Sequence, residues 1–386
     1  MKRIILTALV VLMTLTAGAR DKNFHIFICI GQSNSEGNAR PEQIDKENVP
    51  SNFKMMAAVD FMDMGRKTGK WYPAVPPLCR QDTGLTPGDW FGRTMAENLP
   101  KGHSVGIINV SVAGCKIEAF MKDEAEAYAA TGADWLQNIM KIYDNNPYNY
   151  VLALAKKAQK DGVISGILLH QGESNPNDEE WCNKVKSIYD MLLKDLKLKA
   201  EDCPLLVGET VNGDRGGVCA GMNEYIGRIP SVIPTGYVIS SSGCKENFDR
   251  LHFSAEGYRT LGRRYAAKML SLMGIEIAPE EAKEPESPVV HAMPRFPGMP
   301  AAPAGMPRMK QNVTFNISAP AAKEVFLVAQ FADERIPMVK NSAGVWSATV
   351  QPEAAGAYYY EVDGKKFVDP GNPKTMTVSV LELPAE

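Results

Sequence analysis

The chain has 386 residues, of which 45% are hydrophobic and 23% are charged, with 42 Lys and Arg against 45 Asp and Glu. This composition is that of a globular protein and excludes intrinsic disorder or a collagen-like architecture for most of the chain. A formal net charge of -3 provides no broad cationic surface, so we expect no nucleic-acid partner.

The first nineteen residues have the features of a secretory signal peptide. Lys2 and Arg3 form a charged start, residues 4–15 form an apolar run, and Ala17-Gly18-Ala19 is a small-residue cleavage signal. The apolar run is too short for a bilayer, which needs roughly 20 residues, and no later segment is long and apolar enough to span one. We therefore expect cleavage after Ala19, export to the periplasm or out of the cell, and no membrane span.

Short apolar runs alternate with helical patterns through the next 250 residues or so. Strands are expected at residues 23–30, 105–110, 164–169, 205–207 and 237–240. Helical spacing covers residues 89–99, with Asp89 as the expected N-cap, and residues 148–161, 179–198 and 255–273. Strands that alternate with helices indicate a parallel sheet covered on both faces. We predict an α/β domain over residues 20–274, a three-layer α/β/α sandwich around a five-stranded parallel sheet.

The composition changes after Gly274. Residues 275–309 are rich in Pro, Ala, Met and Glu, which is typical of a semi-rigid linker. Short strand patterns separated by turn residues follow, and Asp363-Gly364 between two of them is a hairpin signal. We therefore predict a small all-β sandwich over residues 310–386.

Polar segments follow four of the expected strands. They are Gly31-Gln32-Ser33-Asn34, Ser111-Val112-Ala113-Gly114, residues 170–175 (His-Gln-Gly-Glu-Ser-Asn) and residues 249–254 (Asp-Arg-Leu-His-Phe-Ser). The carboxyl ends of parallel strands meet at one edge of a sheet, which is where α/β proteins bind their ligands. Four polar segments converging there predict a functional site, because exposure to solvent alone does not require such convergence.

Together these segments resemble the motifs of the SGNH hydrolases, and most closely those of the carbohydrate O-acetylesterase branch, the sialate O-acetylesterase and acetylxylan esterase-like domains. The resemblance covers about residues 22–274 and implies a flavodoxin-like fold. It also implies a serine carboxylic-ester hydrolase that acts on an acetylated polysaccharide or oligosaccharide, with no metal and no organic cofactor.

The resemblance assigns the catalytic roles residue by residue. Ser33 is expected to be the nucleophile, His252 the base that activates it, and Asp249 the acid that orients the imidazole. Glu173 and Glu209 also follow strands and are rival candidates for the orienting acid. Asn34 is expected to support the site together with these two carboxylates.

The oxyanion hole is expected to consist of the Ser33 and Gly114 backbone N–H groups and the Gln171 side chain. The sequence departs from the family pattern here, because Ala113-Gly114-Cys115 stands where Gly-Gly-Thr is usual and Phe120 where Trp is frequent. Cys115 leaves open a thiol enzyme, although we expect it to be a bystander.

Two sets of aromatic residues have alternative interpretations. Trp135 and Tyr143, with Met121, lie in an insertion over about residues 116–147, where packing is favoured over stacking on a sugar. The C-terminal region resembles the early-set immunoglobulin-like modules of bacterial polysaccharide esterases, which are related to glycogen-binding modules. We expect its aromatic residues Trp346 and Tyr358-Tyr359-Tyr360 to pack in the core of the module rather than to form a platform for a sugar.

The sequence thus predicts an exported carbohydrate esterase that removes O-acetyl groups, with acetyl-xylan as the first substrate by analogy and O-acetylated sialate as the alternative. A non-catalytic carbohydrate-binding protein on a hydrolase fold is the hypothesis from another class. The pairing of the seven cysteines and the oligomeric state are left open.

Overall fold

The computed structural model describes residues 20–277 and, nearer the C-terminus, residues 313–330, 332, 335–341, 344–350, 356–369 and 379–381. The packing of the backbone divides the chain into two compact units, Met1–Val289 and Val290–Glu386, and each is described by itself. The predicted signal peptide and most of the predicted linker lie outside the described residues.

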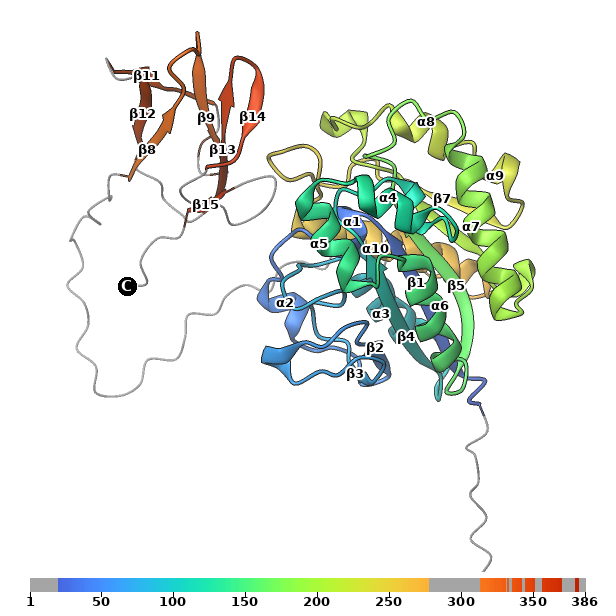
Figure 1. Ribbon diagram of the computed structural model, residues 1–386. Coiled ribbons are helices and arrows are strands. Elements are labelled where there is room, and N and C mark those ends of the chain that lie inside the picture. The colour runs from blue at the N-terminus through green and yellow to red at the C-terminus, as the bar shows by residue number, and fades with distance from the viewer. Residues whose placement is uncertain are drawn as a thin grey trace, which may run out of the picture. The chain divides into compact units, whose positions relative to one another are not determined.

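A seven-stranded sheet forms the centre of the N-terminal unit, in the order β3-β2-β4-β1-β5-β6-β7 (Figure 1). The strands are β1 (Phe24–Gly31), β2 (Phe53–Met56), β3 (Trp71–Pro73), β4 (Ser104–Ser111), β5 (Val163–His170), β6 (Leu205–Gly208) and β7 (Gly236–Ile239). Neighbouring strands are parallel throughout, except that β2 and β3 are antiparallel.

The five predicted strands are β1, β4, β5, β6 and β7, and they are adjacent in the flavodoxin-like order. The predicted number was nevertheless wrong, because β2 and β3 extend the sheet beyond β4. These two strands have four and three residues, which is too short for an alternating pattern to stand out from the surrounding loops.

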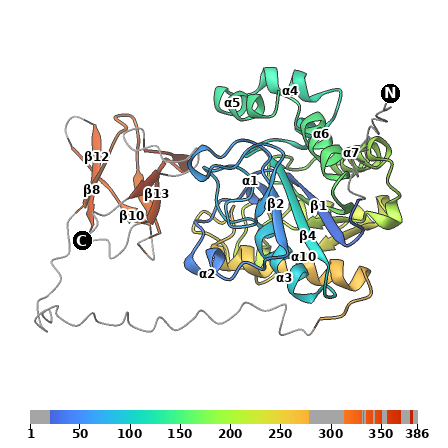
Figure 2. The ribbon, with the colours of Figure 1, turned by 90° about the horizontal axis from the view of Figure 1, so that it is seen from below.

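Helices cover both faces of this sheet (Figure 2). Phe24, Ile26, Ile28 and Ile30 of β1 belong to a core that includes α6 and α7, whereas Phe27 and Cys29 face the core of α3 and α10. The helices are α1 (Ser33–Glu36), α2 (Gln43–Lys46), α3 (Pro87–Asn98), α4 (Ala125–Thr131), α5 (Asp134–Ile142), α6 (Pro147–Ala158), α7 (Trp181–Leu196), α8 (Met222–Ile226), α9 (Ile229–Val232) and α10 (Ala255–Leu272). The three-layer prediction is confirmed. None of the helices in the described part of the chain is both long and apolar enough to cross a membrane.

The start of α3 differs from the prediction. Thr86 is the N-cap, since its hydroxyl accepts a hydrogen bond from the Gly88 N–H, and Pro87 begins the helix. Asp89 lies at the third helical position and accepts from the Thr86 N–H in return, which completes a capping box. Asp89 as the N-cap was therefore wrong, because both residue types serve helix starts and only their hydrogen bonds distinguish them.

The C-terminal unit is an antiparallel sandwich of two sheets, in the orders β11-β12-β8 and β10-β9-β13-β14, with β15 paired to β13. Asp363 and Gly364 form a two-residue turn between β13 and β14 with φ of 47° and 75°, as the hairpin signal predicted. Trp346, Tyr358 and Tyr360 are buried in its core, which confirms the packing interpretation for these three. The strands are β8 (Val313–Ser318), β9 (Val325–Ala329), β10 (Ile336–Pro337), β11 (Val339–Lys340), β12 (Val345–Val350), β13 (Gly356–Val362), β14 (Lys365–Phe367) and β15 (Ser379–Leu381).

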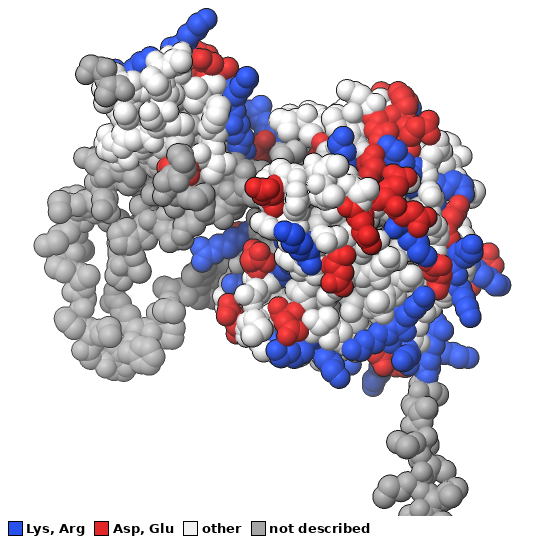
Figure 3. Space-filling model, viewed as in Figure 1, with Lys and Arg blue, Asp and Glu red and all other residues white. Residues whose placement is uncertain are grey.

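Charges of both signs are interspersed over the visible face of the N-terminal unit (Figure 3). All seven cysteines lie within residues 20–277, and none is paired in a disulfide there.

Candidate active site

Ser33 and His252 meet at the carboxyl end of β1. Ser33 is the first residue of α1, immediately beyond that strand, and His252 lies in the loop before α10. His252 Nε2 is 2.9 Å from Ser33 Oγ, and His252 Nδ1 is 2.7 Å from Asp249 Oδ2. The structure thus brings the three predicted catalytic residues into one hydrogen-bonded chain, in the order nucleophile, base, acid.

Asp249 is held in the orientation that this chain requires. Its Oδ1 accepts from the backbone N–H groups of Leu251 and His252, each at 3.0 Å, which leaves Oδ2 for the imidazole. Burial alone would raise the pKa of Asp249, but its hydrogen bonds to His252 and Leu251 and its electrostatic interaction with the imidazole outweigh burial and lower the pKa. An ionised Asp249 accepts from Nδ1–H, so Nε2 is free to accept the Ser33 hydroxyl proton.

The two rival carboxylates have other partners and do not contact His252. Glu173 accepts from Asn34 Nδ2 at 2.6 Å and lies 3.8 Å from His170 Nε2. Glu209 accepts from Asn212, Ser240 and Ser241, and so holds the ends of β6 and β7. Neither is placed to orient the imidazole.

Asn34 ties Ser33 to the loop that carries His252. Its side-chain nitrogen donates to Glu173 Oε1 and to the Leu251 carbonyl at 3.0 Å, and its oxygen accepts from the Phe253 N–H at 3.3 Å and the Tyr258 hydroxyl at 2.7 Å. Asn34 is fully buried, so water does not compete for these bonds. The supporting role expected for Asn34 therefore has a geometric basis.

Two backbone donors are available to an oxyanion. The N–H groups of Ser33 and Gly114 have no acceptor within residues 20–277. Gly114 has a φ of 66°, which glycine adopts without strain. These are the two backbone donors that the sequence predicted.

The predicted third donor, Gln171, is already engaged. Its side chain is fully buried, and its nitrogen lies 2.7 Å from Asn175 Oδ1, 3.1 Å from Gln32 Oε1 and 3.3 Å from the Cys115 carbonyl. An amide nitrogen carries two hydrogens, so these acceptors already exceed its capacity. In this geometry both N–H groups of the predicted third donor already have acceptors, so neither is free for an oxyanion.

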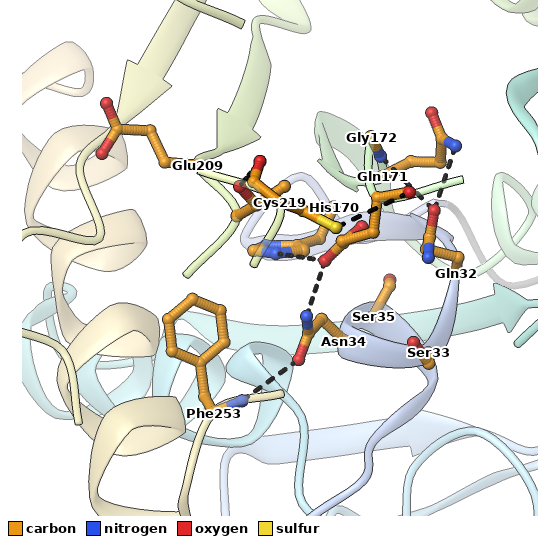
Figure 4. Close-up of polar contacts among 12 residues, drawn as sticks. Gln32, Ser33, Asn34, Ser35, His170, Gln171, Gly172, Glu209, Cys219 and Phe253 are labelled. Carbon is orange, nitrogen blue, oxygen red and sulfur yellow. Dashed lines mark hydrogen bonds and ion pairs between the residues drawn. The ribbon is translucent and has the colours of Figure 1, made fainter. Parts of the chain in front are cut away.

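Gln32 presents the free amide instead. Its oxygen accepts from the backbone N–H groups of Gly172 and Ser174. Because backbone N–H groups only donate, the amide atom that faces them is the oxygen and the other is the nitrogen. Figure 4 shows this oxygen turned towards Gly172 and away from Ser33. Gln32 Nε2 has no acceptor in residues 20–277 and is not fully buried, so it is accessible to solvent.

A buried ion pair holds the loop that carries Gly114. Glu36, at the end of α1, pairs with Arg80 and also accepts from the Ala113 N–H. Burial raises the pKa of the Glu36 carboxyl, while Arg80 and the Ala113 N–H act against that rise. The pair thus links the helix of the nucleophile to the loop of the oxyanion glycine.

Cys115 is unsuited to the nucleophilic role. It is fully buried, and burial raises the pKa of its thiol well above the ordinary value. A thiol nucleophile needs the opposite shift and access to substrate.

The aromatic residues of the insertion divide into two kinds. Tyr143 is fully buried and accepts from Arg80, so packing is confirmed for it, and Met121 packs partly buried against the same core. Trp135 is 40% exposed.

Sequence reasoning missed the roles of Gln32, Glu36 and Arg80. Gln32 lies inside the first polar segment, and its position next to Ser33 was a usable signal. Glu36 and Arg80 are 44 residues apart, and nothing in their local sequence marks them as partners.

Comparison with solved structures gives similarities at low identity. A protein from Arabidopsis thaliana is 20% identical, with 65% of this chain and 99% of that chain covered and a TM-score of 0.45. A carbohydrate acetylesterase from Xanthomonas citri is 15% identical, with 86% and 74% covered and a TM-score of 0.46. NanS is 13% identical, with 66% and 99% covered and a TM-score of 0.45.

Comparison with family models divides the chain in two. Residues 301–379 match carbohydrate-binding module 48, the isoamylase N-terminal domain, in agreement with the predicted glycogen-binding-like module. Residues 23–271 match the model described as carbohydrate esterase, sialic acid-specific acetylesterase. These residues contain the whole constellation around Ser33, and they make up well over half of the chain. The protein therefore belongs to this family of carbohydrate esterases.

Proposed function

We propose that the protein is a serine esterase that removes O-acetyl groups from a glycan through an acetyl-Ser33 intermediate. The observation that carries this proposal is the hydrogen-bonded chain Ser33–His252–Asp249, with distances of 2.9 and 2.7 Å. It lies beside two backbone N–H groups that have no acceptor within residues 20–277.

The reaction proceeds by two acyl transfers. Ser33 Oγ attacks the acetyl carbonyl carbon while its proton passes to His252 Nε2, and the negative charge on the carbonyl oxygen is stabilised by the Ser33 and Gly114 N–H groups. The intermediate collapses, the sugar oxygen takes the proton from Nε2, and the acetyl group stays on Ser33. A water molecule then attacks with His252 as base, and acetate leaves. Asp249 stays ionised throughout.

The third donor to the oxyanion is Gln32 Nε2. Gln171 acts through it, because its nitrogen donates to the oxygen of Gln32 and helps to fix the amide. Each oxyanion donor contributes about 3 kcal/mol to transition-state stabilisation in comparable sites.

The proposed substrate is an acetylated polysaccharide, with acetyl-xylan first. The second unit supports a polymer, because a carbohydrate-binding module raises the local concentration of polymeric substrate at a linked active site. O-acetylated sialate is the second candidate, favoured by the sialic acid-specific description of the matching family.

Acetate release by wild type, Ser33→Ala and Cys115→Ser tests the proposal, with acetyl-xylan, 9-O-acetyl sialate and ethyl acetate as substrates. Wild type and Cys115→Ser are expected to release acetate, and Ser33→Ala is expected to lose it. Release that survives Ser33→Ala would overturn the serine mechanism. If wild type binds glycans but releases no acetate and resists labelling by a fluorophosphonate, the protein is a non-catalytic binding protein.

We also propose export of the protein with removal of residues 1–19. The support is the charged start, the short apolar run and the small-residue signal of the sequence. Expression with a C-terminal tag in a bacterial host, followed by mass measurement of the exported protein, is expected to find Arg20 at its N-terminus. Retention of Met1 on the exported protein would contradict cleavage.

A further inference from the structure

Trp135 differs from the other four tryptophans of the chain. The indole N–H groups of Trp71, Trp90, Trp181 and Trp346 each donate to an oxygen atom. The indole N–H of Trp135 has no acceptor among the described residues, and the side chain is 40% exposed. Tryptophan at such a position offers an apolar ring and an unused donor to a ligand.

Packing does not account for the exposure of Trp135. It lies at the start of α5, which belongs to the insertion between β4 and β5 and lies outside the layers that cover the sheet (Figure 2). The residues of α5 that enter the core are Leu136 and Met140, with Ile139 packed against them. Trp135 is absent from this core, although it belongs to the same helix.

The ring of Trp135 lies directly against the oxyanion glycine. A Cβ atom built on Gly114 would be 2.6 Å from Trp135 Cη2 and 3.1 Å from Cζ3. The benzene edge of the indole therefore covers the backbone whose N–H faces the acetyl carbonyl in the proposed reaction. When an acetyl group is bound at Gly114, the sugar ring that bears it lies close to Trp135, because only one ester oxygen separates the acetyl group from the ring.

We propose that Trp135 forms a subsite for the pyranose ring that carries the acetyl group. The C–H face of a pyranose packs against the indole, and a ring hydroxyl accepts from the free N–H. This inference rests on the proposed function, because the position of the sugar is derived from an acetyl group held at Ser33 and Gly114. It assigns glycan recognition to a residue that touches neither the nucleophile nor the base.

The subsite predicts a difference between sugar esters and simple esters. Methyl tri-O-acetyl-β-D-xylopyranoside serves as the pyranose probe, and ethyl acetate, which has no ring, as the reference. For Trp135→Ala, kcat/KM is expected to fall by about 10- to 100-fold on the pyranoside and to stay within about twofold on ethyl acetate. Trp135→Phe, which keeps an aromatic face without the N–H, is expected to recover part of the loss.

The matched control is Ile142→Ala, which removes an equally exposed side chain (40%) at the far end of the same helix. It is expected to leave both rates unchanged, which separates the subsite from a general loosening of α5. Circular dichroism of each variant tests whether the fold is retained.

Each other outcome counts against the subsite. An equal loss on both esters assigns Trp135 to support of the Gly114 loop alone, and unchanged rates on both show that the ring does not meet the sugar. If wild type cleaves ethyl acetate but not the pyranoside, the subsite is wrong while the serine mechanism stands. If wild type cleaves neither and Ser33 resists a fluorophosphonate, the proposed function itself fails.

Discussion

Replacement of Asp249 by Asn tests which carboxylate orients His252. The amide keeps the size of the side chain, and its oxygen still accepts from the Leu251 and His252 backbone N–H groups as Oδ1 now does. The amide nitrogen then occupies the position of Oδ2, where it donates. It accepts nothing from Nδ1–H, so the imidazole is favoured in the tautomer that presents Nε2–H to Ser33.

The expected loss of activity is large because the contact between His252 and Asp249 is buried. The side chains of His252 and Asp249 are 2% and 3% exposed, so water does not restore the missing acceptor. The same substitution in a serine protease triad lowers kcat by about 10⁴-fold, which corresponds to about 5 kcal/mol of transition-state stabilisation. We expect a loss of this order in kcat for acetate release, with KM changed little.

Glu173→Gln is the matched control, since it makes the same chemical change at the rival carboxylate. Glu173 Oε1 accepts from Asn34, whereas Oε2 has no partner within the described residues. The amide keeps the first contact, so kcat is expected to stay within about threefold. The reasoning is refuted if Glu173→Gln costs as much as Asp249→Asn, or if Asp249→Asn loses less than tenfold while its circular dichroism spectrum matches wild type.

Three further tests concern other parts of the site and the fold. Gln32→Glu keeps the acceptor for Gly172 and removes the proposed oxyanion donor, so kcat on ethyl acetate is expected to fall by about 100-fold or more. An unchanged kcat would show that Gln32 is not the third oxyanion donor. Arg80→Leu leaves Glu36 buried without its partner and is expected to lower the free energy of unfolding in urea by about 3–5 kcal/mol. As the comparison, removal of the exposed Lys67 side chain from its ion pair with Asp60 is expected to cause no measurable loss. Burial raises the pKa of Asp89 to about 8, so the folded state keeps a proton that the unfolded chain releases near pH 4. Stability should therefore fall between pH 5 and pH 8, by up to about 1.4 kcal/mol per unit, and Asp89→Asn should flatten that fall in urea unfolding; an unchanged slope would show that Asp89 is ionised when folded.

The buried strands were predictable because each is an almost continuous apolar run. A strand covered on both faces has no polar alternation to interrupt it, and β1 with its sequence Phe-His-Ile-Phe-Ile-Cys-Ile-Gly is such a case. β2 and β3 escaped prediction because they lie at the edge of the sheet and are short. The start of α3 was misplaced for a different reason, since Thr86 and Asp89 are both typical of helix starts.

The positions of Ser33, Asp249 and His252 followed from the order of strand ends. Parallel strands deliver their carboxyl ends to one edge, so segments more than 200 residues apart meet there without any local signal. The family resemblance favoured Asp249 as the orienting acid, but Glu173 stayed a rival on the sequence because both carboxylates lie at that edge. Only the 2.7 Å contact with Nδ1 distinguishes them.

The different hydrogen bonds of Gln32 and Gln171 show why a motif alone does not assign a donor. Both residues carry the same amide and both follow a strand at the active-site edge. The side-chain nitrogen of Gln171 is surrounded by acceptors, including Asn175 Oδ1 at 2.7 Å. Its oxygen accepts a hydrogen bond from the Trp181 indole N–H. A buried amide whose two ends are both satisfied is a fixed support for its neighbours. Gln32, whose oxygen accepts from two backbone N–H groups and whose nitrogen has no acceptor within residues 20–277, has the one unsatisfied donor of the pair. This is why we propose Gln32, which can donate without breaking an existing bond, as the third donor to the oxyanion.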